Sequence, residues 1–543
     1  MTLREHFPAG ATARPEQARL LDLLDRALTD IDADAPGPHI LALEAPPGVG
    51  KSHLAMTLAA WSEDAYLLTS QKLLQDQYER EFGDRLQLVK GRDNYVCERY
   101  AVPVPTSQGV CRRPRGPVCQ CPYARAKAAA LAGPIFCTNT WYFATLRHWH
   151  AEQLRRRRLL VIDEAHNLEA QLVNVYTVRF SSAEMKEWFG APLPHLASAD
   201  DYRELLGAHA ERLEGDLAVI VRALEHLHPP EVEPEIFLEA PPSREEVVLM
   251  EQRDALDGAL ARLRDFVHGD AEEWVVRYPP EPAATFELVP LSVVPQTREL
   301  LAESAEIVVL SSAYLGPAGA LAESLGVERD DVRSFGAASP FALEQRPLVY
   351  RPVAALSRAR QAEQEPQLFA EIAAILAAHP DDKGVLHVAS YAVARRLMAD
   401  LARRAPADAR RLIFVESSEA KARALEQHRA SPQPTVLLSP SLREGVDLPD
   451  DLLRFQVITK MPYPDLGDPW TAARRARDPR WYAIETAKAL LQTYGRACRH
   501  AEDFGITYVL DAQLGRFLQH YRPLLPEWFL DAAHAALAVS PFD

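Results

Sequence analysis

The feature that most constrains the fold of this chain is a glycine-containing loop set between an apolar segment and a helical one. Residues 39–43 form a short apolar run typical of a buried strand, and residues 52–61 follow with the pattern of a helix. Such an order makes half of a parallel α/β unit, in which the backbone N–H groups at the helix start bind phosphate. The loop consists of Ala45, Pro46, Pro47, Gly48, Val49, Gly50, Lys51 and Ser52.

The residue types in this loop match the chemistry of phosphate binding. Gly48 and Gly50 let the backbone curl so that its N–H groups point at the phosphates. Lys51 is placed to reach the β and γ oxygens, and Ser52 is placed to ligate Mg²⁺. The first position is Ala45, where glycine is more common, and loops of this class accept that change. We therefore expect all eight residues to bind a nucleotide.

A second polar motif follows another apolar run. Residues 159–162 lead directly into Asp163, Glu164, Ala165 and His166. The end of a parallel strand is where an α/β sheet presents catalytic groups. Asp163 is therefore placed to hold Mg²⁺ through water, and Glu164 to orient and deprotonate an attacking water. An acidic pair after a strand is also compatible with a plain helix cap, but the phosphate loop favours the catalytic interpretation.

A third motif lies near the end of the chain, between Gln492 and Arg499, and contains Arg496. Two arginines three positions apart lie on one face of a helix, from which they could reach a γ-phosphate across a cleft. We therefore expect Arg496 and Arg499 to act as arginine fingers.

The spacing of apolar runs predicts two α/β domains with parallel sheets. Helical patterns separate many of the runs, and the division falls near residue 345, where several prolines interrupt the chain. Between residues 180 and 296 the pattern changes to helices joined by proline-rich connectors, which we interpret as a helical insertion in the first domain. The expected strands are residues 39–43, 66–69, 159–162, 307–310, 385–389, 412–415, 435–438, 456–459 and 507–510.

Composition places the chain among ordinary folded proteins, but its charge is unevenly distributed. The 543 residues are 48% hydrophobic and 25% charged, which excludes wholesale disorder and coiled coil. The net charge of -16 argues against a polyanionic partner, yet residues 90–158 hold thirteen Lys or Arg against three Asp or Glu. We expect a cytoplasmic protein, because no run is apolar enough to span a membrane and residues 1–6 lack the core of a signal peptide.

Four of the six cysteines lie close together, at positions 97, 111, 119 and 121. Structural zinc is usually held by pairs of cysteines separated by two residues, and no such pair occurs in this segment. An iron–sulfur cluster accepts thiolates from more irregularly spaced loop positions. The spacing favours a cluster, and zinc or unligated thiols remain as alternatives.

Together these motifs resemble those of a known family. Residues 45–52, 163–166 and 492–499 are similar to motifs I, II and VI of superfamily 2 helicases. More finely, the chain resembles the DinG/XPD branch of iron–sulfur DNA helicases, and matches run from an adenine-side Q-like motif at Arg14 and Gln17 through Asp511. The marks of that branch are residues 91–97, 121–123, 138–139, 444–449 and 460–464.

The resemblance implies a fold and an activity. The fold is α/β, with two RecA-like parallel-sheet motor domains, the first interrupted by a small iron–sulfur cluster domain and a helical Arch-like insertion. The activity is that of an ATP-dependent helicase moving 5′ to 3′ on single-stranded DNA in repair, replication or recombination. The implied boundaries are 1–90, 136–179 and 297–345 for the first motor domain, 91–135 for the cluster domain, 180–296 for the insertion and 346–543 for the second motor domain.

The resemblance also implies roles for individual residues. Besides ATP and Mg²⁺, it implies a [4Fe–4S] cluster held by Cys97, Cys111, Cys119 and Cys121. The nucleotide would also be contacted by Arg14, Gln17, His166, Asp447 and Gln492, of which Asp447 and Gln492 would sense its state. The residues expected to contact DNA are Thr69, Ser70, Arg92, Tyr95 and Asn139.

Two expectations and two alternatives complete the interpretation. We expect a monomer that works on single-stranded and tailed duplex DNA beside single-strand-binding or replication proteins, and no nuclease activity, because no exonuclease segment precedes the first motif. Motif III carries Tyr314 where threonine is usual, which weakens the expectation that hydrolysis is coupled to movement. The alternatives are a nucleotide-switched, cluster-containing binding protein without strand separation, and a remodeller of RNA or hybrid duplexes.

Overall fold

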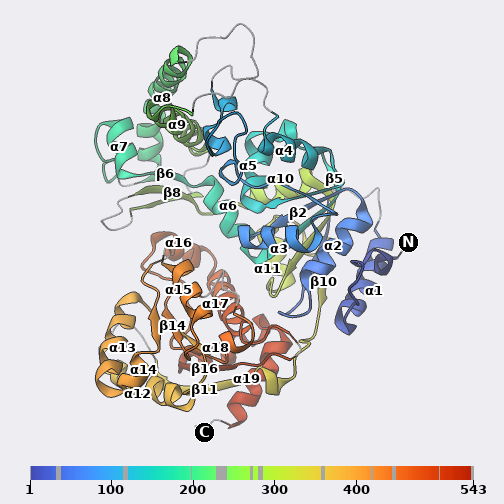
Figure 1. Cartoon of the computed structure of the whole chain (residues 1–543), viewed down its shortest axis with the longest axis vertical. Helices are drawn as coiled ribbons and strands as arrows, with labels where there is room; N and C mark the ends of the chain where they lie inside the picture. Colours follow the sequence, from blue (N-terminus) through green and yellow to red (C-terminus); the bar gives the residue numbers. More distant parts are fainter. Residues whose placement is uncertain are drawn as a thin grey trace.

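The computed structural model describes residues 2–31, 38–113, 120–196, 198–227, 241–269, 273–278, 285–355, 361–417, 420–442, 448–500 and 502–539. Two parallel sheets, each flanked by helices, form two α/β domains (Figure 1). A third body, containing α7, α8 and α9, lies beside the first α/β domain, at the upper left in Figure 1. The α/β class with two parallel-sheet domains, which the sequence predicts, is confirmed.

The first α/β domain is built on seven strands in the order β10-β1-β9-β5-β2-β4-β3. All neighbouring strands are parallel. The strands are β1 (His39–Glu44), β2 (Ala65–Thr69), β3 (Gln87–Leu88), β4 (Ile135–Asn139), β5 (Arg157–Asp163), β9 (Ala305–Ser312) and β10 (Val332–Gly336). The helices are α1 (Pro15–Thr29), α2 (Lys51–Ser62), α3 (Lys72–Phe82), α4 (Pro122–Ala132), α5 (Thr140–Trp149), α6 (Leu168–Tyr176), α10 (Val294–Ser304) and α11 (Ala318–Leu325).

Both faces of this sheet are buried, which explains why its strands are nearly continuous apolar runs rather than alternating ones. In β1, Ile40 and Ala42 point into one hydrophobic cluster. Leu41 and Leu43, which alternate with them, point into the cluster on the opposite face. The sheet therefore forms the middle layer of the domain, and its strand ends are left to carry polar groups.

The second α/β domain is built on six parallel strands in the order β11-β16-β15-β12-β14-β13. The strands are β11 (Leu348–Ala354), β12 (Gly384–His387), β13 (Leu412–Phe414), β14 (Val436–Ser439), β15 (Phe455–Ile458) and β16 (Ile506–Asp511). The helices are α12 (Gln361–Ala378), α13 (Tyr391–Arg404), α14 (Pro406–Ala409), α15 (Lys421–Ala430), α16 (Pro469–Arg477), α17 (Pro479–Tyr494), α18 (Gln513–Tyr521) and α19 (Glu527–Val539). Every strand that the apolar runs predict is present in one of the two sheets.

The helical insertion, expected at residues 180–296, is defined from the start of its first strand to the end of its last strand, residues 178–290, and it contains a sheet that the sequence did not predict. Its helices are α7 (Ser182–Phe189), α8 (Ala199–Leu227) and α9 (Arg244–His268). Three short antiparallel strands, β6 (Val178–Phe180), β8 (Phe286–Pro290) and β7 (Trp274–Arg277), lie side by side in that order. Phe180, Phe286 and Phe266 of α9 belong to one buried cluster, so the sheet and helices share a core. No helix in the described ranges is both long enough and apolar enough to cross a membrane.

The basic run at residues 155–158 has a structural role that its charge did not predict. Arg157 at the start of β5 is 1% exposed and donates hydrogen bonds to five backbone carbonyls. Arg155 pairs with Asp64 at 2.6 Å, and Arg158 lies over the ring of Trp61. Because these arginines lie where β5 begins, they occupy the sheet edge opposite to Asp163, where β5 ends.

Candidate active site

The phosphate loop lies between β1 and α2 in the conformation that its glycines predict. Gly48 and Gly50 have φ angles of +85° and +89°, in the left-handed region that other residues rarely adopt. A Cβ atom on Gly48 would lie 2.0 Å from the ring of Phe341, so no side chain fits at that position. The loop is thus held both by its own backbone and by a ring from the segment that joins the two α/β domains.

The Q-like motif braces this loop rather than lying apart from it. The Arg14 guanidinium donates to the Gly48 carbonyl. The Gln17 amide donates to the Gly50 carbonyl at 3.2 Å, and its oxygen accepts from the backbone N–H of Arg14 at 2.8 Å. Gln17 is buried, so these contacts fix the position of α1 against the loop.

The acidic pair lies at the end of β5, beside the phosphate loop. The Lys51 ammonium is 3.8 Å from a carboxylate oxygen of Glu164 and 3.3 Å from the Ala45 carbonyl. Glu164 has a φ of +53°, a strained conformation for a residue with a side chain and one that occurs at functional sites. Asp163 is buried, and its carboxylate accepts from the Tyr78 hydroxyl at 2.9 Å.

The two carboxylates of this pair have pKa values displaced in opposite directions. Burial, followed by repulsion from Glu164, raises the pKa of Asp163 to about 6. Burial alone would raise the pKa of Glu164, but the charge of Lys51, the hydrogen bond with His166 and the charge of Arg499 outweigh it and lower that pKa to about 2. Two titratable neighbours with separated pKa values are typical of a catalytic site.

His166 links three parts of the molecule. Its Nδ1 is 2.8 Å from the Ser312 hydroxyl at the end of β9, and its Nε2 contacts the Gln492 amide of α17. The Lys488 ammonium, also on α17, lies 3.4 Å from the His166 carbonyl. His166 and Gln492 are therefore in contact with each other across the boundary between the two α/β domains, and the sequence placed both of them beside the nucleotide.

The expectation that Arg496 and Arg499 share one helix face is wrong, because α17 ends at Tyr494. The chain turns at Gly495, where a Cβ atom would lie 2.7 Å from Cγ of Pro47 in the phosphate loop. Close approach of the two domains therefore requires glycine here, and both arginines follow in the turn. Arg499 lies near enough to Glu164 to lower its pKa, whereas Arg496 lines a small cavity of the second α/β domain.

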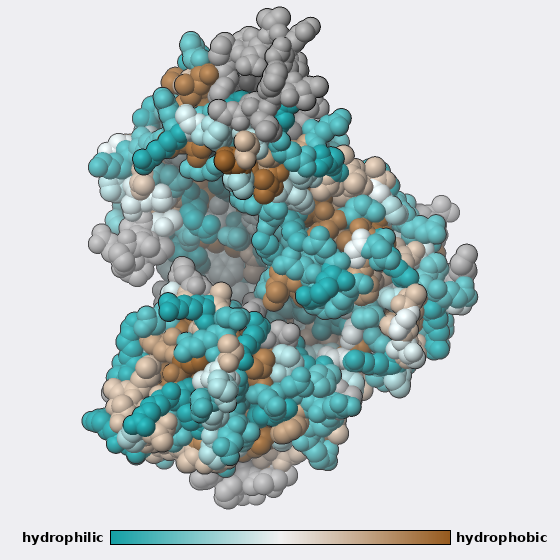
Figure 2. Space-filling view, in the orientation of Figure 1, coloured by the Kyte–Doolittle hydropathy of each residue, from teal (hydrophilic) through white to brown (hydrophobic). Residues whose placement is uncertain are grey.

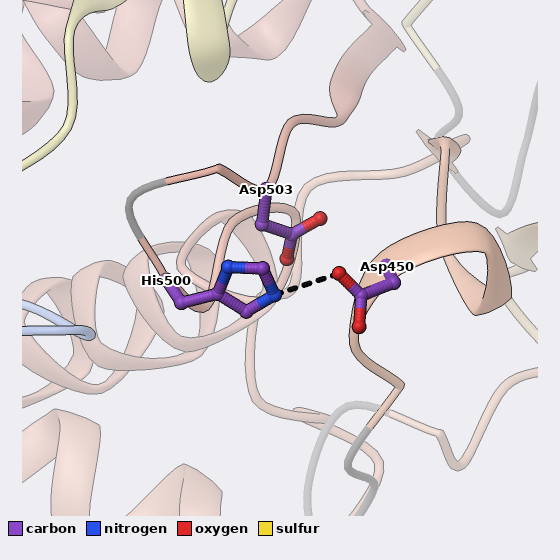
Figure 3. A group of neighbouring side chains, drawn as sticks. All are labelled: Asp450, His500 and Asp503. Carbon is purple, nitrogen blue, oxygen red and sulfur yellow. Dashed lines mark hydrogen bonds and ion pairs between the residues drawn. The ribbon is translucent and has the colours of Figure 1, made fainter.

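Asp450, His500 and Asp503 form a cluster beside the turn that carries Arg499 (Figure 3). His500 Nε2 is 2.7 Å from an Asp450 oxygen. One oxygen of Asp503 accepts from the Arg454 guanidinium at 2.9 Å, and the other accepts from the Arg499 backbone N–H at 2.9 Å. Because a guanidinium already faces Asp503, we interpret this cluster as a brace for the Arg499 backbone and not as a metal centre.

Three of the four clustered cysteines lie within the described ranges. Cys97 and Cys121 are buried, Cys111 is partly buried, and all three are free thiols. Cys97 packs with Tyr100, Val104 and Val110 in a small apolar cluster. Cys121, with Cys111 packed beside it, belongs to a different apolar cluster, that of the first α/β domain. Cys119 lies outside the described residues, so a shared iron–sulfur site for the four cysteines stays a prediction.

The residues expected to contact DNA occupy the carboxyl ends of two neighbouring strands and the segment after β3. Thr69 of β2 and Asn139 of β4 are partners in the sheet register. Thr69 is fully buried, and the Asn139 side chain caps α5 by accepting from the Tyr142 N–H at 2.8 Å. Both side chains therefore make contacts within the protein that stabilise the ends of β2 and β4.

The remaining residues of that set make local contacts. The Ser70 carbonyl accepts from Gln171 at 3.0 Å. Arg92 lies over the ring of Tyr123 at 4.2 Å, and Tyr95 meets the same ring edge-on. Asp447, expected to sense the nucleotide, falls outside the described residues.

Two residues of the site were missed from the sequence. Tyr78 of α3 is fully buried, and its hydroxyl reaches Asp163. The available signal was weak: a buried tyrosine needs a hydrogen-bond partner, but the sequence does not reveal which. Glu44, the last residue of β1, accepts from the backbone N–H groups of Leu315 at 2.6 Å and Gly316 at 3.2 Å.

A cavity of about 380 Å³ separates part of the first α/β domain from α16 and α17. Ion pairs cross from one side to the other, between Arg474 and Glu169 at 2.5 Å and between Arg480 and Glu323 at 2.7 Å. The Arg277 guanidinium of β7 pairs with Asp468, which precedes α16, at 2.8 Å. The second α/β domain thus contacts both the first domain and the insertion, and the surface is hollowed between these bodies (Figure 2).

Comparison with known proteins places these features in a family context. Residues 372–532 match the helicase C-terminal domain family. A segment of 112 residues is 30% identical to the regulator of telomere elongation helicase 1 homolog of Drosophila grimshawi, and equally to that of Drosophila willistoni. That segment covers 18% of this chain and only 11% of each of those proteins.

The whole fold is similar to solved XPD structures. An XPD helicase superposes with a TM-score of 0.61 at 14% identity, covering 98% of this chain and 99% of the other. Xpd4 of S. tokodaii superposes with a TM-score of 0.55 at 15% identity, covering 94% of this chain and 99% of the other. The resemblance to the DinG/XPD helicases is confirmed at the level of the fold: the chain has the fold of these XPD structures, including two parallel-sheet domains, and its match to the helicase C-terminal domain family is confined to residues 372–532.

Proposed function

We propose that this protein is an ATP-driven DNA helicase that moves 5′ to 3′ along single-stranded DNA. One observation carries the proposal: the phosphate loop, the acidic pair and the turn carrying Arg499 meet at one place between the two α/β domains. Pro47 touches Gly495, and Lys51 and Arg499 both act on the carboxylate of Glu164. A nucleotide bound there would contact both domains, as a motor that closes on ATP requires.

The residues of the site divide the work of hydrolysis. The curled loop and Lys51 would hold the β and γ phosphates, and Arg499 would offset the charge that develops on the transferred phosphoryl group. Glu164 is ionised at neutral pH because of its lowered pKa, so its carboxylate can accept a hydrogen bond from the attacking water and orient it. This carboxylate would act as the base when ATP and Mg²⁺ make that water more acidic. The serine hydroxyl of Ser52 and the carboxylate of Asp163 are hard oxygen donors that fit Mg²⁺, which would neutralise phosphate charge.

The contacts of His166 provide a route from hydrolysis to domain movement. His166 follows the catalytic pair by two residues and touches Ser312 of the first domain and Gln492 of the second. Loss of the γ-phosphate would change the position of Glu164 and with it the contacts of His166. Opening and closing of the two domains would then step the DNA along the ends of β2 and β4.

A [4Fe–4S] cluster on Cys97, Cys111, Cys119 and Cys121 is part of this proposal. The segment that carries these cysteines is tied to α9 of the insertion by a 2.7 Å ion pair between Arg113 and Glu246. Single-stranded DNA would pass between this segment and the insertion. Anaerobic protein should contain about four irons and four sulfides per chain. Changing Cys97 to Ser should remove them, whereas a Cys137→Ser control should keep them, and zinc in their place would contradict this part of the proposal.

The experiment that tests the function compares duplexes with a single-stranded tail on either the 5′ or the 3′ side. We expect ATP-dependent strand separation only with the 5′ tail, and none with Glu164→Gln. DNA-stimulated ATP hydrolysis without strand separation would instead favour a nucleotide-switched binding protein. Equal stimulation by RNA of the same length would favour an RNA or hybrid remodeller.

A further inference from the structure

Tyr314 belongs to one α/β domain by its position in the chain and to the other by its packing. It follows β9 of the first domain by two residues. Its side chain is 4% exposed and forms part of a hydrophobic cluster otherwise made by buried residues of the second domain, among them Ile484 of α17 and Leu514 of α18. Its hydroxyl donates to the Leu524 carbonyl, also in the second domain, at 2.6 Å.

The loop that carries Tyr314 is fixed on its other side to the nucleotide site. Glu44, which directly precedes the phosphate loop, accepts from the N–H groups of Leu315 and Gly316. Ser312 accepts from the Tyr314 N–H at 3.3 Å and also contacts His166. The loop is therefore held by the end of β1, which leads into the phosphate loop, and by the end of β9, which contacts His166.

Gly316 allows this loop to turn tightly against the second domain. Its φ is +87°, and a Cβ atom there would lie 3.5 Å from Ile484 and 3.9 Å from the Tyr314 hydroxyl. The backbone therefore comes close to α17 just where the ring of Tyr314 enters the core. Separating the two domains would expose that ring to water and break its hydrogen bond to Leu524.

The simplest alternative is that Tyr314 only fills space, as a leucine or phenylalanine would. Two features argue against this interpretation. The hydroxyl reaches a carbonyl of the other domain, which an apolar side chain would not satisfy. A shorter hydroxylated side chain such as threonine could not span the same distance, so tyrosine makes a contact that a shorter residue lacks.

We propose that Tyr314 is a positioning residue that keeps the two α/β domains associated, and that this association does not require a bound nucleotide. It acts as a fixed point about which the domains turn, so that the cleft opens by rotation and not by separation. If the proposed function holds, the same residue passes changes at Glu44 and His166 to the second domain. The association itself does not depend on that function.

Energy transfer between two dyes tests this proposal directly. Dyes would be attached through unnatural amino acids at the exposed positions Arg80 on α3 and Arg403 on α13, one in each domain. In the nucleotide-free wild-type protein we expect high transfer. In Tyr314→Thr we expect a loss of transfer that a non-hydrolysable ATP analogue restores, and in Tyr314→Phe a smaller loss.

The matched control is Tyr66→Phe, which removes a buried hydroxyl that also donates to a backbone carbonyl, that of Arg155 at 2.8 Å, but within one domain. This variant should keep the wild-type transfer. Circular dichroism would show that each variant is folded, and Tyr314→Phe keeps the test valid if Tyr314→Thr does not fold. Wild-type transfer in both Tyr314 variants would overturn the proposal. If the protein does not bind ATP, the proposed function fails, but the nucleotide-free difference between wild type and Tyr314→Thr still decides the role of Tyr314.

Discussion

At the residue scale, the ionised carboxylate of Asp163 serves the proposed chemistry but lowers the stability of the folded protein, because it is buried beside Glu164. Burial and the neighbouring Glu164 raise its pKa from 3.8 to about 6. A raised pKa means that the folded state binds the proton more tightly than the unfolded state does. Stability from this group is therefore present at low pH and is lost as the pH rises through about 6.

This behaviour predicts that Asp163→Asn stabilises the protein at alkaline pH. The gain in the free energy of unfolding should be up to about 3 kcal/mol at about pH 8 and should shrink towards about pH 4. Urea unfolding without Mg²⁺ at both pH values measures it. Glu164→Gln is the control, and it should lower the free energy of unfolding at about pH 8. The lowered pKa of Glu164 means that its ionised form stabilises the folded state above its usual titration range. A gain from Asp163→Asn that is the same at both pH values would contradict the burial argument.

Tyr78 predicts a second effect at this scale. Its hydroxyl donates to Asp163, and this hydrogen bond favours the ionised carboxylate that would hold Mg²⁺. Tyr78→Phe should raise the Mg²⁺ concentration needed for half-maximal ATP hydrolysis roughly fivefold, the equivalent of one hydrogen bond. Tyr202→Phe, which removes a buried hydroxyl in the insertion, should leave that concentration unchanged. An unaltered Mg²⁺ requirement in Tyr78→Phe would show that Asp163 is oriented by other groups.

The sequence predicts those residues of the site whose chemistry is local. Lys51 lies in the loop motif that follows β1, and Asp163 is the last residue of the apolar run that forms β5, so the sequence places both near strand ends. Tyr78 could not be predicted in the same way, because its partner lies 85 positions away and is brought near by the sheet order. The contact between Arg14 and Gly48 likewise spans 34 positions.

At the scale of elements, a largely buried ion pair between Arg113 and Glu246 links the cysteine segment to α9. The side chains of Arg113 and Glu246 are 14% and 4% exposed. Arg125 and Glu98, a pair in the same region, are 55% and 58% exposed. Removing one partner of a buried ion pair lowers the free energy of unfolding much more than removing one partner of an exposed pair.

Arg113→Ala should therefore destabilise the protein by about 3 kcal/mol, since it removes the cation that faces a buried carboxylate. Arg125→Ala is the matched control and should change stability little, because solvent screens an exposed pair. Thermal unfolding of the two variants beside wild type measures the difference. A loss in Arg113→Ala as small as that in Arg125→Ala would contradict the argument from burial.

The sequence predicts an element well where its apolar pattern is clear. It predicts an element poorly where contacts between distant residues determine where that element begins or ends. The strands of both parallel sheets read as apolar runs, because both faces are buried. The antiparallel strands β6, β7 and β8 have three to five residues each, too few to show a period. Helix α17 ends at Tyr494 because Gly495 must approach Pro47, a contact with no local signal.

At the scale of the whole molecule, the two α/β domains contact each other in at least three places. Pro47 meets Gly495, His166 meets Gln492, and Tyr314 enters the core of the second domain. None of these contacts follows from the sequence alone, because each joins residues from separate domains. They place the proposed nucleotide site at a junction whose geometry depends on both domains, which is why ATP turnover and domain movement would be linked.

The central claim is tested most directly by the rate of ATP hydrolysis with and without single-stranded DNA, in wild type and in Lys51→Ala. We expect DNA to stimulate the wild-type rate, and Lys51→Ala to lower the stimulated rate roughly a hundredfold or more, because it removes the cation that faces the phosphates. Lys186→Ala, which removes an exposed lysine of the insertion, should hydrolyse ATP as wild type does. A wild-type rate indifferent to DNA, or DNA-stimulated hydrolysis that persists in Lys51→Ala, would contradict the account.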